Sequence, residues 1–141
     1  MLTRLIYASR VSPGIDARNV RDILAASHRN NKARGVSGAL LFNSGYFLQW
    51  LEGGRSAVNE RFRVIGGDPR HREAEILGYD VVAMRTFPDW TMGYAGEGSL
   101  NGELFFRYTD GGTFNPFTLT ADAAVALIHD LSRASLSLTP A

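Results

Sequence analysis

One glutamine stands out among the side chains of this sequence that could do chemistry. Gln49 lies inside the apolar run FLQWL, where Phe47 and Leu51 would share its face of a strand. A primary amide on a buried face needs hydrogen-bond partners, because an unpaired buried amide is costly. On a solvent-exposed face the same amide would need no explanation. Gln49 is therefore either an ordinary surface residue or part of a buried polar site.

A tyrosine and two asparagines could complete such a site. Tyr7 lies in the apolar N-terminal run LTRLIYA, and a buried phenol usually donates to an acceptor such as an amide oxygen. Asn30 and Asn31 lie near the end of a helical pattern, where asparagine is commonly a C-terminal cap. If the helix instead covers the face that bears Tyr7 and Gln49, these side chains converge on one pocket. Apolar walls with a few amide groups suit a flat, amide-rich ring.

Charged side chains suggest a phosphate-bearing ligand, although each has a simpler explanation. The run Asp68-Pro69-Arg70-His71 supplies an arginine and a histidine that could meet a phosphate, or it is an ordinary loop. The first 35 residues carry seven basic and two acidic side chains. This basic section fits either a phosphate-bearing ligand or a solvated helix face.

The overall composition limits the class of protein. The chain has 141 residues, of which 45% are hydrophobic and 21% charged, as in one soluble globular domain. The net charge of +1 argues against a nucleic-acid-binding protein. Cysteine is absent, which excludes a cysteine nucleophile or metal ligand and fits a cytoplasmic location. We expect no metal site, since the three histidines are widely separated, and no membrane span, which needs roughly 20 apolar residues.

The elements that must position these side chains follow from the hydrophobic periodicity. Strands are predicted over residues 2–8, 36–42, 46–53, 75–85 and 90–95, with helices over 16–31 and 56–65. The order β-α-β-β-α-β-β predicts an α+β, ferredoxin-like fold. Two helices would cover one face of a mixed, mainly antiparallel sheet. A helical extension would follow at the C-terminus, with a short helix and an irregular loop over residues 99–119.

Each predicted helix has an apolar stripe at helical spacing. The first helix would begin after the N-cap Asp16 and bury Val20, Ile23, Leu24 and Ser27. The second helix would bury Val58, Phe62 and Ile65. A last helix, capped by Thr120, would have its stripe at Ala124, Ile128 and Leu131. That stripe would either cover the sheet or bind another protein surface.

Six segments in order resemble the BLUF family of blue-light sensors that use FAD. They are RLIYAS at 4–9, DILAASHRNN at 22–31, GVSGALLF at 35–42, FLQWLEG at 47–53, DPRH at 68–71 and RTFPDWTMGY at 85–94. The resemblance covers about residues 2–95. It implies a ferredoxin-like fold with flavin between two helices, and it divides the chain into a flavin-binding domain (1–97) and a C-terminal helical cap (98–141).

The resemblance also assigns roles to residues. It implies that Tyr7 is the photoactive tyrosine, Gln49 the switching glutamine and Asn31 a hydrogen-bond partner of the flavin ring. The other implied flavin-binding residues are Ile23 and Ile65, which would sandwich the ring, Ser27 and Asn30 beside it, and Asp68, Arg70 and His71 near the ribityl-phosphate end. Trp90 and Met92 would lie on the signal-transmitting strand, and either of them could face inward.

The implied function is that of a blue-light photoreceptor and not of an enzyme. FAD, or else FMN or riboflavin, would be held noncovalently. Light would drive electron and proton transfer from Tyr7 to the flavin, and Gln49 would change its hydrogen bonds. The signal would pass to a separate partner protein, and we expect the chain to form homo-oligomers.

Two other functions compete with this interpretation. A small ferredoxin-like hydrolase of phosphate esters or acyl phosphates would use an arginine and an asparagine beside the phosphate, but it gives no role to Tyr7 or Gln49. A binding module that needs no cofactor would use only the sheet or the C-terminal helix. The colour of the purified protein separates the three hypotheses, because bound flavin makes a protein yellow.

Overall fold

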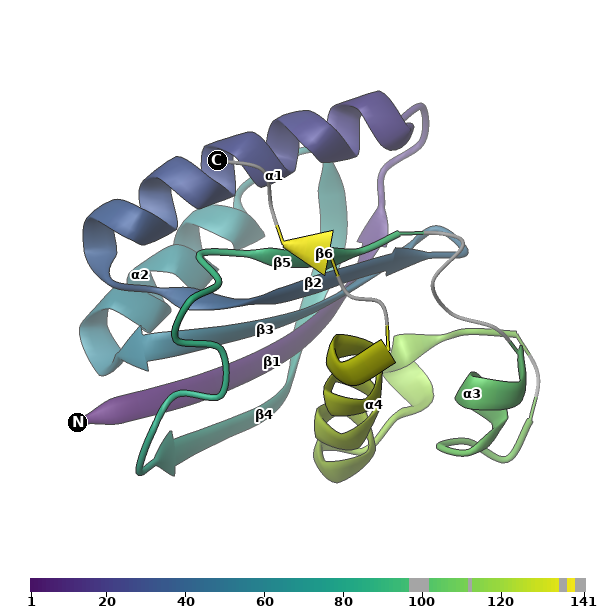
Figure 1. Cartoon of the computed structure of the whole chain (residues 1–141). Helices are drawn as coiled ribbons and strands as arrows, with labels where there is room; N and C mark the ends of the chain where they lie inside the picture. The colour runs from purple at the N-terminus through teal and green to yellow at the C-terminus, as the bar shows by residue number, and fades with distance from the viewer. Residues whose placement is uncertain (97–101, 112, 135–136, 139–141) are drawn as a thin grey trace.

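The computed structural model describes residues 1–96, 102–111, 113–134 and 137–138. Its helices and strands appear in Figure 1. They are β1 (Leu2–Val11), α1 (Ala17–Arg34), β2 (Ser37–Asn43), β3 (Tyr46–Gly54), α2 (Arg55–Gly66), β4 (His71–Val82), β5 (Gly93–Ala95), α3 (Gly102–Phe106), a 3-10 turn (Pro116–Thr118), α4 (Ala121–Ala134) and β6 (Ser137–Leu138). The predicted domain boundary between residues 97 and 98 lies outside the described residues.

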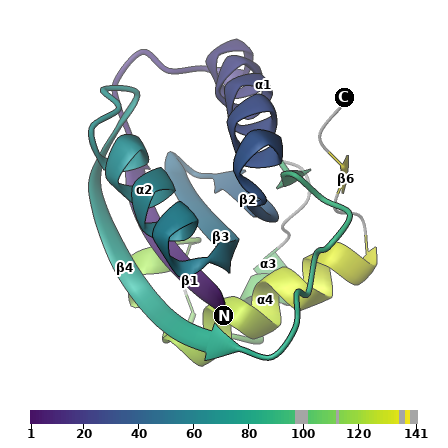
Figure 2. The same cartoon turned by 90° about the vertical axis from the view of Figure 1, so that its left-hand side faces the viewer.

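The predicted fold class is confirmed. The strands form one sheet in the order β4-β1-β3-β2-β5-β6, and β2 and β5 form its parallel pair while the other neighbours are antiparallel. Helices α1 and α2 lie on one face of the sheet and α4 lies on the other (Figure 2). Strands β1 and β3 are neighbours in the centre, which places Tyr7 directly opposite Gln49.

Two hydrophobic cores lie on the two faces of the sheet. Successive side chains of a strand point to opposite faces, so Leu5 and Tyr7 join the core under α1 and α2 while Ile6 joins the core under α4. Leu51 and Trp50 divide in the same way on β3. Burial on both faces explains why the central strands are almost continuously apolar.

Helix α1 begins as predicted and ends later than predicted. The side chain of Asp16 accepts hydrogen bonds from the backbone of Arg18 and Asn19 at 2.9 and 3.1 Å, which caps the helix. The helix runs to Arg34, and Gly35 ends it in the left-handed conformation at φ 67°, where glycine avoids the strain of a β-carbon. The asparagines therefore lie inside the helix, and the interpretation of Asn30 and Asn31 as C-terminal caps is wrong.

The second half of the sheet departs from the predicted boundaries and burial. Strand β4 begins at His71, four residues before the predicted start, and β5 covers only residues 93–95. On α2, Val58 is buried as predicted, but Phe62 and Ile65 are only partly buried. Both side chains pack against the edge of the core: Ile65 also lines a pocket, and the Phe62 ring lies 5.4 Å from the Tyr7 ring, centroid to centroid. The second buried residue of α2 is Arg61, which the sequence pattern did not indicate.

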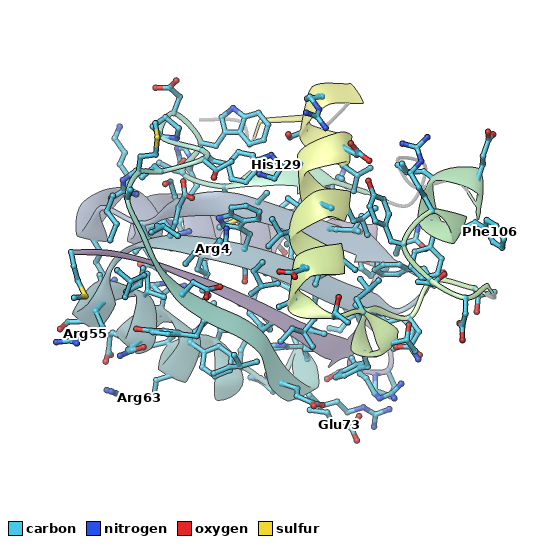
Figure 3. All side chains as sticks on the ribbon, turned by 90° about the horizontal axis from the view of Figure 1, so that it is seen from below. Arg4, Arg55, Arg63, Glu73, Phe106 and His129 are labelled. Carbon is cyan, nitrogen blue, oxygen red and sulfur yellow. The ribbon has the colours of Figure 1, made fainter. Side chains whose placement is uncertain are left out.

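Helix α4 covers the sheet face opposite α1 and α2 (Figure 3). Its predicted stripe of Ala124, Ile128 and Leu131 is buried there, and the hydroxyl of Thr120 accepts from the backbone of Ala123 at 3.1 Å. The stripe therefore packs against its own sheet, as the first of the two interpretations expected. No helix in the described ranges is both long and apolar enough to span a membrane.

Candidate functional site

A pocket lies between α1, α2 and the sheet face that carries Tyr7 and Gln49. It brings together nine of the ten residues implied to bind flavin: Tyr7, Ile23, Ser27, Asn30, Gln49, Ile65, Asp68, Arg70 and His71. Ala26, Leu40, Phe47, Arg61 and Val64 complete its lining. Its walls are therefore mixed, with apolar side chains from α1, β2, β3 and α2 and polar groups among them. Such a pocket is typical of a site for a small organic ligand.

A chain of hydrogen bonds runs across the floor of the pocket. The Tyr7 hydroxyl donates to Gln49 Oε1, and Gln49 Nε2 donates to Met92 Sδ at 3.4 Å. Tyr7 is 3% exposed and Gln49 is 2% exposed. Burial raises the pKa of the Tyr7 phenol well above its ordinary value, with smaller opposing effects of Arg61 and Asp68. The phenol therefore stays protonated as a donor, and the amide is buried with partners on both sides.

Asn31 lies behind the pocket and not in its lining. It is 1% exposed, and its Nδ2 donates to the carbonyl oxygen of Thr91 at 3.0 Å. Its Oδ1 is buried and has no hydrogen-bond partner among the described residues. A buried acceptor without a donor is unusual in a folded protein. The side chain thus has one hydrogen bond to the segment before β5 and one free acceptor.

His28, which was not predicted as a site residue, contacts the same segment before β5 that Asn31 contacts. The Nδ1 atom of His28 is within hydrogen-bonding distance of Thr91 Oγ1, and His28 lies one helical turn before Asn31 on α1. Together the two α1 side chains hold both the carbonyl and the hydroxyl of Thr91. The i, i+3 spacing of His28 and Asn31 was the available sequence signal. Thr91 immediately precedes Met92, so this contact fixes one end of the polar chain.

Met92 and Trp90 lie on opposite sides of the sheet. Met92 is fully buried with Tyr7 in the core under α1 and α2, whereas Trp90 packs against the core under α4. The Trp90 ring stacks on Phe87 with centroids 4.9 Å apart and an interplanar angle of 9°. Met92 is therefore the inward residue in this structure. Both residues precede β5, whose bounds are Gly93–Ala95, instead of lying within it.

The buried carboxylate of Glu52, which the sequence did not predict, holds the beginning of the segment between β4 and β5. Glu52 at the end of β3 is 1% exposed and accepts from the backbone of Phe87 at 2.6 Å and of Thr86 at 3.0 Å. It also accepts from Trp50 Nε1 at 3.0 Å and from Ser37 Oγ at 3.2 Å. These donors compensate for burial of the charge. The available sequence signal was its place in a strand pattern, directly after the apolar run FLQWL.

The Asp68, Arg70 and His71 side chains make mostly internal contacts. Arg70 donates to both carboxylate oxygens of Asp68 at 2.6 to 3.1 Å, and this pair holds the pKa of Asp68 below its ordinary value. His71 Nδ1 lies 2.8 Å from Ser9 Oγ, and His71 Nε2 contacts the carbonyl of Ile65. His71 therefore joins β1, β4 and α2, while Arg70 is directed by Asp68.

Arg61 is the charged lining residue that the sequence analysis missed. The helical stripe of α2 places an apolar residue at Val58, and a charged side chain one turn later is the signal that was available. Its side chain is 5% exposed, and its Nε has no hydrogen-bond partner in the described part of the chain. Burial is the main cause that lowers the pKa of Arg61, and nearby Arg34 lowers it further.

The residues present fit a flavin. Its ring system needs apolar surfaces above and below, and Ile23 and Ile65 project from the two helices that border the pocket. The ring edge carries carbonyl acceptors and one N–H donor, and the pocket region holds the complementary unpaired atoms Arg61 Nε and Asn31 Oδ1. Among the described residues, no cluster of three or more histidine, cysteine or acidic side chains could hold a metal.

The sequence matches the family described as sensors of blue-light using FAD, BLUF, over residues 2–93. The chain belongs to this family. The predicted resemblance is therefore confirmed, and residues 2–93 belong to a photosensory class of flavin-using domains.

Individual relatives agree with this membership. The blue light- and temperature-regulated antirepressor BluF of Escherichia coli is 36% identical over 87 residues, which are 62% of this chain and 22% of that protein. The ground state of BlsA is 30% identical, with a TM-score of 0.88 over 99% of this chain and 93% of BlsA. The dark state of BlrB, a BLUF protein, is 33% identical, with a TM-score of 0.79 over 96% of this chain and 97% of BlrB. This chain spans less than a quarter of the antirepressor.

Proposed function

We propose that this chain is a blue-light photoreceptor that holds one oxidised FAD noncovalently between α1 and α2. The observation that carries the proposal is the buried chain from the Tyr7 hydroxyl through the Gln49 amide to Met92, on the floor of a pocket. A binding module that needs no cofactor gives no role to this buried tyrosine–glutamine pair. The same pocket accepts the ring of FMN or riboflavin, since the three flavins share it.

The side chains that would hold the flavin come from both helices. Ile23 and Ile65 would sandwich the ring, and Asn31 would bond its edge through the free Oδ1 atom. The remaining flavin-binding side chains in this proposal are Ser27 and Asn30 on α1, with Asp68, Arg70 and His71 nearer the phosphate-bearing tail. Residues 1–97 would form the flavin-binding domain and residues 98–141 its helical cap.

When bound, the flavin supplies the absorption of blue light and the capacity to take up an electron and a proton. Tyr7 would be the donor of both, because its phenol is protonated and buried beside the pocket. The proton would leave through the one hydrogen bond that the hydroxyl donates, which is to Gln49 Oε1. Return of the electron and proton to Tyr7 would restore the phenol, so no substrate would be consumed.

Gln49 would keep the light-induced change as a new arrangement of its hydrogen bonds. In the described arrangement its oxygen faces Tyr7 and its NH₂ group faces Met92. A half-turn of the amide, or a change of tautomer, exchanges donor and acceptor and removes the hydrogen bond to the sulfur. The segment before β5 would then lose its hydrogen bond to Gln49 and keep the contacts of Thr91 with Asn31 and His28. A two-state element of this kind is what a switch requires.

The signal would pass to a separate protein, and the chain would also associate with itself. Exposed apolar side chains on and after β4, the edge strand, support this part of the proposal: Ile76, Tyr79, Val81 and Met84. Edge strands with exposed apolar residues are common sites of association. A cytoplasmic location also stays a prediction.

One spectrum tests the proposed function. The purified full chain is reconstituted with excess FAD, freed of unbound ligand and illuminated with blue light. We expect a flavin spectrum that shifts to the red by a modest, reversible amount, and heat should release the flavin intact for chromatographic identification. Absence of bound flavin after reconstitution would contradict the proposal.

A further inference from the structure

Arg61 is a buried cation without a counter-ion inside the described structure. It projects from the middle of α2 into the pocket and is 5% exposed. The neighbouring carboxylate, Glu60, is paired with Arg63 at 2.6 Å, and Asp68 is paired with Arg70 at 2.6 Å. The acidic side chain next to Arg61 in sequence and the one in the pocket therefore each form an ion pair with another arginine.

An arrangement of this kind costs stability unless a ligand compensates for it. A guanidinium removed from water needs acceptors for its N–H groups, and burial without them is unfavourable. Arg34, at the end of α1, adds repulsion because it carries the same charge. Arg61 therefore weakens the ligand-free fold, whereas an apolar side chain of similar length would not.

The ligand atom that Arg61 would satisfy is an electron-rich oxygen. A flavin offers two kinds, the carbonyl oxygens of the ring and the phosphate oxygens of the tail. The position of Arg61 favours the ring, because Arg61 lies one helical turn before Ile65, the α2 side chain proposed to sandwich the ring, and lines the same pocket as Tyr7. The phosphate end of the proposed site is the one with Arg70, whose guanidinium is already oriented by Asp68.

We propose that Arg61 is a flavin-binding residue that donates hydrogen bonds to a carbonyl oxygen of the ring. This inference rests on the proposed function and deepens it. Negative charge that reaches the ring from Tyr7 would be delocalised onto that oxygen, so a guanidinium beside it also favours the reduced flavin. Arg61 would thereby set how readily the flavin accepts the electron.

The test compares Arg61→Met with a matched control. Methionine keeps the length and apolar part of the side chain and removes the charge and donors. The control is Arg63→Met on the same helix, because Arg63 is 75% exposed and points away from the protein (Figure 3). For each full-length protein, dissociation constants are measured for riboflavin, FMN and FAD, together with the reduction potential of the bound flavin and the thermal midpoint without flavin.

We expect Arg61→Met to weaken all three flavins by a similar factor, about tenfold to about a hundredfold, as for a lost bond to a charged group. Its bound flavin should have a more negative reduction potential, and its flavin-free midpoint should rise by roughly 2 to 4 °C. Arg63→Met should leave the binding constants and potential unchanged. Arg61→Lys should recover the potential more than the affinity, because lysine keeps the charge but lacks the planar donor fork.

Each other outcome overturns the inference in a distinguishable way. If wild type binds no flavin, both the proposed function and this inference fail. If wild type binds flavin and Arg61→Met binds it equally well, only the inference fails. A loss confined to FMN and FAD would place Arg61 at the phosphate, and a lower flavin-free midpoint would make it a structural residue. If the flavin-free chain shows no cooperative transition, thermal midpoints are measured at several flavin concentrations. Extrapolation of these midpoints to zero flavin then gives the flavin-free stability.

Discussion

Replacement of Asn31 by alanine separates a flavin contact from a structural one. The substitution removes two atoms with different surroundings. Nδ2 donates to the Thr91 carbonyl at 3.0 Å, and Oδ1 is buried without a partner in the described ranges. In the flavin-free protein, the loss of Nδ2 is unfavourable and the loss of Oδ1 is favourable. In the flavin-loaded protein, the proposed bond from Oδ1 to the ring is lost as well.

The expected changes in stability and in flavin binding follow from the loss of these two atoms. A buried carbonyl left without its donor costs about 1–3 kcal/mol, and a buried orphan acceptor that is removed relieves a similar amount. The flavin-free stability of Asn31→Ala should therefore lie within about 1 kcal/mol of wild type. Flavin binding should weaken by about 1–3 kcal/mol, which is roughly a 5-fold to 150-fold increase in Kd.

Quenching of flavin fluorescence gives the Kd, and thermal unfolding without flavin gives the stability. Asn59→Ala is the control, because Asn59 is an exposed asparagine on α2 outside the pocket lining. It should change neither quantity. A destabilised Asn31→Ala protein with an unchanged Kd would show that Asn31 only holds the Thr91 segment, and the assignment of its oxygen to the flavin would be wrong.

Three further predictions concern the hydrogen-bond chain and the loop near the tail. Tyr7→Phe and Gln49→Leu should still bind flavin but lose the light-induced red shift, since one lacks the donor and the other the switch; a normal reversible shift in flavin-loaded Gln49→Leu would refute the mechanism. Thr91→Val removes the hydroxyl that meets His28 and should change the rate of dark recovery more than the Kd, as followed by absorption after a light pulse. Because Arg70 lowers the pKa of Asp68, this carboxylate stabilises the fold above the ordinary aspartate pKa of about 4 and loses that effect as the pH falls through the lowered value. Asp68→Asn should therefore show a smaller loss of thermal stability between pH 7 and pH 2 than wild type does.

The fold followed from the sequence because its signals are local. Alternation along FLQWL placed Gln49 on the face of Phe47 and Leu51, and Asp16 preceded a helical stripe. Backbone geometry makes such patterns nearly independent of distant residues. The pairing of Tyr7 with Gln49 needed one step more, the antiparallel register of β1 and β3, which no local pattern contains.

The tertiary structure alone decided which polar groups are buried and which way the segment before β5 faces. Arg61 and Glu52 look like surface charges in sequence, yet both are buried because elements far along the chain close over them. Trp90 and Met92 are two residues apart, which in a regular strand would give them the same face. The segment is not a strand, so they separate to opposite sides of the sheet. Burial and direction outside regular elements depend on contacts between distant residues, and a local pattern cannot carry that information.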